Sequence, residues 1–87
     1  MPYIKSEARI RIEDGGLPST PGEVNFLVTA LLDECIKVWG LSYGTVNSLV
    51  GALECAKLEL YRRVAAPYED VKIKENGDVF SKENLTI

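Results

Sequence analysis

Four polar side chains in the segment 42–67 have the spacing needed to act together. Asn47, Glu54 and Tyr61 are seven residues apart, and Lys57 lies between Glu54 and Tyr61. On a helix, residues three, four or seven positions apart share a face. We interpret the four as a polar seam with an internal ion pair, which fixes the register of a dimer. The alternative is that they line a small-ligand pocket at the dimer interface.

A second candidate constellation is acidic. It consists of Asp33, Glu34, Glu54 and Glu59. Helical nucleotide pyrophosphohydrolases of the MazG type bind magnesium through paired carboxylates on two helices and dimerise, so their pattern is the one to test. This sequence departs from it, because Lys37 and Lys57 stand where further acids are needed. The alternative function, a metal-dependent hydrolase, requires carboxylates of both helices to converge on one ion.

A third cluster is basic and contains Lys57, Arg62 and Arg63. A nucleic-acid-binding dimer could use it, but a net charge of −3 disfavours phosphate backbones as ligands. The chain has no histidine and no glycine-rich phosphate loop. We therefore predict no catalytic, cofactor-binding or metal-ligating residues and no enzymatic activity.

Two helices are predicted to position these residues. Thr20, Pro21 and Glu23 form a capping box with proline at the first helical position, so one helix covers about 20–39 and ends at Gly40. Ser42 caps a second helix, about 42–66. The short connection predicts an antiparallel two-helix hairpin.

Both ends of the chain carry signals for extended structure. Apolar and charged residues alternate from Ala8 to Ile12, which predicts an extended N-terminal arm over 1–19. Asn76-Gly77 is a favoured type I′ turn, so about 71–80 is predicted to form a β-hairpin within 68–80, followed by a tail at 81–87. The fold class is therefore mainly α, a single small domain spanning 1–87.

The second helix is apolar on more than one side. The stripe Val46, Leu49, Leu53, Ala56 and Leu60 would face the first helix. Val50, Val64, Cys55 and Leu58 would then remain uncovered. An 87-residue chain buries little surface alone, so we predict a homodimer with a four-helix core.

The cysteines and the hydropathy pattern limit the remaining possibilities. In the predicted hairpin, Cys35 and Cys55 are displaced by about 12 Å, too far for a disulfide, and both are expected to be buried thiols. The chain contains neither an apolar stretch of membrane-spanning length nor a signal core. We therefore predict a cytoplasmic protein without membrane contact.

The segment 52–80, ALECAKLELYRRVAAPYEDVKIKENGDVF, resembles a family of short uncharacterised proteins of bacterial and phage genomes. The stretch PGEVNFLVT at 21–29 resembles that family more loosely. The resemblance implies a self-contained, phage-associated protein and no particular activity. Together with the two-sided apolar helices, it favours a dimerising interaction or accessory protein with an unidentified protein partner.

Overall fold

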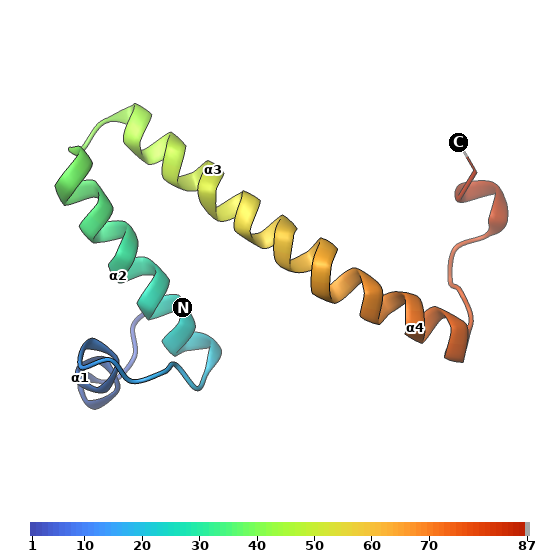
Figure 1. The fold of residues 1–87 in the computed structure, drawn as a ribbon, viewed down its shortest axis with the longest axis horizontal. Coiled ribbons are helices and arrows are strands. Elements are labelled where there is room, and N and C mark those ends of the chain that lie inside the picture. Colours follow the sequence, from blue (N-terminus) through green and yellow to red (C-terminus); the bar gives the residue numbers. More distant parts are fainter. Residues whose placement is uncertain (87) are drawn as a thin grey trace. The chain divides into compact units, whose positions relative to one another are not determined.

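The computed structural model describes residues 1–86, and the chain divides into two compact units, Met1–Leu49 and Val50–Ile87. Figure 1 shows helices throughout and no strand within the described residues. The elements are α1 (Ser6–Glu13), α2 (Pro21–Trp39), α3 (Tyr43–Leu60), the π-helical turn η1 (Tyr61–Ala65), α4 (Ala66–Asn76) and the 3₁₀ turn η2 (Lys82–Asn84).

The predicted extended arm is wrong, because Ser6–Glu13 forms helix α1. The alternation of Ala8, Ile10 and Ile12 suggested a strand, but Ala8 and Ile12 are also one helical turn apart. Ile12 is buried and Ala8 half-buried, whereas Ile10 is exposed. Contact with α2 therefore selects the helical period, since one turn brings the two inward side chains onto one face.

A polar cluster joins α1 to the start of α2. The Arg11 guanidinium pairs with the Glu23 carboxylate and also donates to the Leu17 carbonyl at 2.7 Å. The Ser19 N–H and hydroxyl donate to the same Glu23 oxygen, at 3.0 and 3.2 Å. Glu23 is nearly enclosed, with 12% of its side chain exposed. These bonds fix how the connecting loop returns to α2.

Gly16 is required for that loop by close approach. Its N–H donates to the Arg11 carbonyl at 2.9 Å. A Cβ at this position would lie 2.7 Å from the same carbonyl oxygen and 2.9 Å from the Arg11 Cγ. The loop can therefore close over the end of α1 only with glycine here.

The predicted caps of α2 and α3 are confirmed. The Glu23 N–H donates to the Thr20 hydroxyl at 3.1 Å, and the Thr45 N–H donates to the Ser42 hydroxyl at 3.1 Å. Gly40 ends α2 with a φ of 91°, a conformation that glycine adopts without strain. One detail differs: the Glu23 carboxylate accepts from Ser19 and not from the capping Thr20.

The helix that begins at Tyr43 does not end near Pro67. α3, η1 and α4 follow one another directly, so helix continues to Asn76 (Figure 1). Pro67 has no N–H to donate to the carbonyl four residues before it. The helix widens there, and the Ala66 N–H donates to the Tyr61 carbonyl, five residues back. The π turn thus lets the helix pass the proline.

The predicted C-terminal β-hairpin over 71–80 is also wrong. Asn76 ends α4, and Gly77 caps it with a φ of 92°. An Asn-Gly pair favours a left-handed backbone both in a type I′ turn and after a helix, so the local signal fits either structure. Since the long helix is not part of a simple two-helix hairpin, the predicted four-helix core built from two hairpins no longer follows.

Very little of the described chain is buried. Among residues 1–86 the buried apolar side chains are Ile12 and Leu49, both of the first unit. From Val50 to Thr86 no side chain is buried. The second unit therefore has no core of its own.

Candidate functional site

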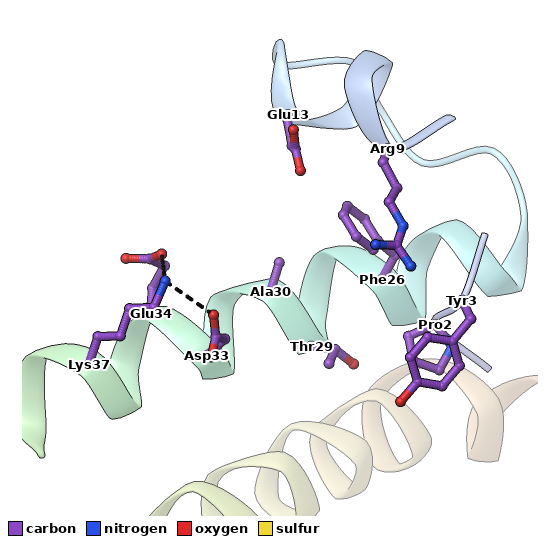
Figure 2. A pocket seen from close by; sticks show the side chains of 10 residues that line it. All are labelled: Pro2, Tyr3, Arg9, Glu13, Phe26, Thr29, Ala30, Asp33, Glu34 and Lys37. Atoms are coloured by element: carbon purple, nitrogen blue, oxygen red, sulfur yellow. Dashed lines mark hydrogen bonds and ion pairs between the residues drawn. The ribbon is translucent and has the colours of Figure 1, made fainter. Parts of the chain in front are cut away.

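The first unit contains a groove of about 680 Å³ along α1 and α2 (Figure 2). The side chains that line it are Pro2, Tyr3, Arg9, Glu13, Phe26, Thr29, Ala30, Asp33, Glu34 and Lys37. Those of α2 recur every three or four residues and so share one helix face. The groove exists only because 6–13 is helical and lies against this face.

An arginine and a phenylalanine form one wall of the groove. The Arg9 guanidinium lies over the Phe26 ring, 5.3 Å from its centroid, as Figure 2 shows. This cation–π contact joins α1 to α2 across the groove. The sequence did not indicate it, because the two residues are 17 positions apart and the segment with Arg9 was predicted to be extended.

Two of the three carboxylates that line the groove are paired with an amine. The Lys37 ammonium lies 3.2 Å from a Glu34 oxygen and 3.3 Å from an Asp33 oxygen. The hydrogen bond to Glu34, followed by that to Asp33, raises the pKa of Lys37 above its ordinary value. A divalent cation would have to displace this ammonium before it could bind both carboxylates.

The other acids of the magnesium hypothesis are also paired within their own helix. Glu54 lies 3.1 Å from the Lys57 ammonium, and Glu59 lies 3.5 Å from the Arg62 guanidinium. Within residues 1–86, no group of three or more metal-ligating side chains has a geometry suited to an ion. Lys37 and Lys57, the two lysines that break the MazG-type pattern, therefore form ion pairs with the carboxylates that would have to bind the metal.

Of the contacts predicted within the polar seam Asn47, Glu54, Lys57 and Tyr61, the structure contains the ion pair. Glu54 and Lys57 form the ion pair, while Asn47 is exposed on α3. The Tyr61 hydroxyl donates to the Glu69 carboxylate, with both oxygens at 3.2 Å, and not to a member of the seam. The negative charge of Glu69 raises the pKa of the Tyr61 phenol. A role of the four residues at an interface stays a prediction.

The two arginines of the basic cluster share one acid. Arg62 and Arg63 both reach the same Glu59 oxygen, at 3.5 and 3.6 Å. All three side chains remain more than half exposed. They form a solvated helix surface, and a phosphate backbone would compete with Glu59 for the two guanidinium groups.

The second unit carries its exposed apolar side chains in rows. One row continues the apolar stripe predicted for the second helix. We call it the long stripe, and it consists of Leu53, Ala56, Leu60, Val64, Tyr68 and Val71. Every member is exposed, and the five larger side chains range from 39% for Leu53 to 63% for Leu60 and Tyr68. No described helix is long and apolar enough to cross a bilayer. The long stripe is thus an apolar surface on a helix with charged flanks.

The cysteines differ from each other in exposure. Both are free thiols, Cys35 half-buried and Cys55 exposed. The expectation of a buried thiol is therefore wrong for Cys55.

The sequence model for a domain of unknown function, DUF6899, matches residues 1–79. The chain belongs to this family. The match confirms the resemblance to an uncharacterised family, and it includes all four α-helices of the chain. No curated protein and no solved structure matches the chain. The family assignment therefore leaves the function to be argued from the residues described above.

Proposed function

We propose that this protein is a small, non-enzymatic interaction protein that acts as a homodimer. The observation that carries the proposal is the lack of any buried side chain from Val50 to Thr86. Burial of apolar surface is the main favourable term in folding. Most helical stability in proteins comes from packing of an apolar face, so a long helix without such packing needs a partner.

The amount of exposed surface supports the same conclusion. Three side chains of the long stripe, Leu60, Val64 and Tyr68, are 62–63% exposed. Contiguous exposed apolar surface of this kind marks protein–protein interaction sites. A second copy is the partner present wherever the chain is made, and two-fold dimers are the commonest soluble oligomers.

The chemistry of the polar residues supports a binding role over catalysis. The acids best placed to act together are neutralised by Lys37 and Lys57. The negative charge of Glu69 raises the pKa of the Tyr61 phenol, which makes it a weaker proton donor. A homodimer that presents helical surfaces is the function most consistent with these features.

Light scattering combined with circular dichroism tests the proposal. We expect a mass of about twice 9.6 kDa at micromolar concentration, and loss of helical signal together with loss of the dimer on dilution. A protein that keeps its full helical signal at the monomer mass would refute the proposal, since the second unit would then fold without a partner.

A further inference from the structure

The long stripe follows a heptad up to the π turn. Its first members, Leu53, Ala56 and Leu60, are separated by three and then four residues, which is the spacing of the a and d positions of a coiled coil. A heptad that continued without a break would next place an arginine, a proline and an aspartate on the stripe, at 63, 67 and 70. Those residues could not form an apolar seam.

The π turn corrects the register. Because the Ala66 N–H donates to the Tyr61 carbonyl, η1 contains one residue more than an α-helical turn. One added residue moves the next heptad positions to Val64, Tyr68 and Val71. The π turn at the proline thus also keeps the stripe apolar from Leu53 to Val71, about 27 Å of helix.

We propose that the long stripe is the dimer interface and that it pairs with the same stripe of a second copy in antiparallel orientation. The proposal rests on the homodimer proposed above and assigns its interface. The six positions are symmetric about residue 62. Leu53 and Val71 each lie nine residues from it, Ala56 and Tyr68 each lie six residues from it, and Leu60 and Val64 each lie two residues from it. Antiparallel helices crossing at residue 62 therefore bring each a position opposite a d position.

The sizes of the side chains select this orientation. In the antiparallel pair, Ala56 of one copy faces Tyr68 of the other, and leucine faces valine in the remaining layers. Facing large and small side chains fill a core evenly. A parallel pair would set alanine against alanine and tyrosine against tyrosine, which leaves a void in one layer and overfills another.

The flanks of the stripe permit its burial. Two charged side chains beside it are already paired within the same helix, Lys57 with Glu54 and Lys72 with Glu75, both at 3.1 Å. The Lys72 ammonium also lies 5.5 Å from the centroid of the Tyr68 ring. A second helix can therefore cover the stripe without leaving the Lys57 or the Lys72 ammonium unpaired.

A matched pair of variants tests the interface. Leu60 belongs to the long stripe, whereas Leu58 lies two residues away, about 200° around the helix. Both are exposed, at 63% and 54%, so neither substitution disturbs packing inside one chain. By sedimentation, we expect Leu60→Glu to raise the dimer dissociation constant at least about a hundredfold, because each dimer loses two buried leucines. Leu58→Glu is expected to leave the constant within about threefold.

Disulfide trapping tests the orientation in a chain with Cys35→Ser and Cys55→Ser. We expect an equimolar mixture of Ala56→Cys and Tyr68→Cys chains to form covalent dimers under mild oxidation, while neither variant forms them alone. The Ala56→Cys chain alone would crosslink in a parallel dimer, and that result would overturn the orientation.

The outcomes separate this inference from the proposed function. A wild-type monomer refutes the homodimer itself. A stable wild-type dimer that Leu60→Glu leaves intact refutes the long stripe as its interface, while the homodimer stands. A dimer that Leu60→Glu dissociates and the mixed cysteines trap supports both.

Discussion

Truncation of the single buried residue of α1 gives the sharpest test of how the first unit is held together. Ile12 is 5% exposed and Ile10, two residues before it on the same helix, is 59% exposed. Ile12→Ala and Ile10→Ala remove the same atoms from the same helix. The helix-propensity gain is also the same for both, so their difference reports burial alone.

The magnitude follows from the exposed fractions. Each substitution removes three carbons, worth about 2.4 kcal/mol when fully buried. Scaled by the buried fraction of each side chain, the stabilising free energy lost is about 2.3 kcal/mol at Ile12 and about 1.0 kcal/mol at Ile10. The difference of about 1.3 kcal/mol corresponds to roughly a tenfold change in an equilibrium constant.

Amide hydrogen exchange of residues 6–13 measures this local opening directly. We expect the backbone amides of α1 to exchange about ten times faster in Ile12→Ala than in Ile10→Ala, with the amides in the middle of α2 little changed. Equal exchange rates in the two variants would refute the packing of α1 on α2 through Ile12. They would mean that α1 is held only by its polar contacts.

Three further predictions concern the same junction. Gly16→Ala is expected to lower the free energy of unfolding by about 1–3 kcal/mol in urea titrations, because a Cβ would lie 2.7 Å from the Arg11 carbonyl; an unchanged midpoint would contradict the close approach. Thr20→Ala is expected to cost about 1 kcal/mol in the same assay through loss of the α2 cap, and Thr20→Ser to retain most of the stability. The third is a pH dependence. Hydrogen bonds from Ser19, and then Arg11, lower the pKa of Glu23 below its ordinary 4.5, so its contribution is present above pH 4.5 and is lost as the pH falls through the lower folded value. The protection factors of the α1 amides should therefore fall in that acid range in the wild type but not in Glu23→Gln, and the same acid response in both would refute the assignment.

The local signals of the sequence were reliable where they did not depend on a distant partner. The capping residues Thr20 and Ser42 and the terminating Gly40 place α2 and the start of α3 correctly, because each acts within one helical turn. The local signals gave a wrong prediction where the same residues are typical of two different structures. Asn76-Gly77 favours a left-handed backbone after a strand or a helix, and the choice depends on what precedes it.

The candidate sites divide in the same way. The Glu54–Lys57 pair could be predicted from spacing, because it lies within one turn of one helix. The groove with Arg9 and Phe26 could not, because it requires α1 to be helical and to fold back on α2. The partner of Tyr61 was also missed: Glu69 is eight residues away, beyond the three, four and seven used to find neighbours.

The sequence by itself determined a small, mainly helical chain, the caps of its longest helices, and apolar residues on more than one side of the second helix. Those properties depend on composition and on contacts within a turn. The tertiary structure decided that Ala8 and Ile12 share the less exposed face of a helix that contacts α2, because packing selected one of two periods that the pattern allowed. It also decided that Pro67 widens the long helix without ending it, since a π turn accommodates the missing N–H and lets α4 continue to Asn76.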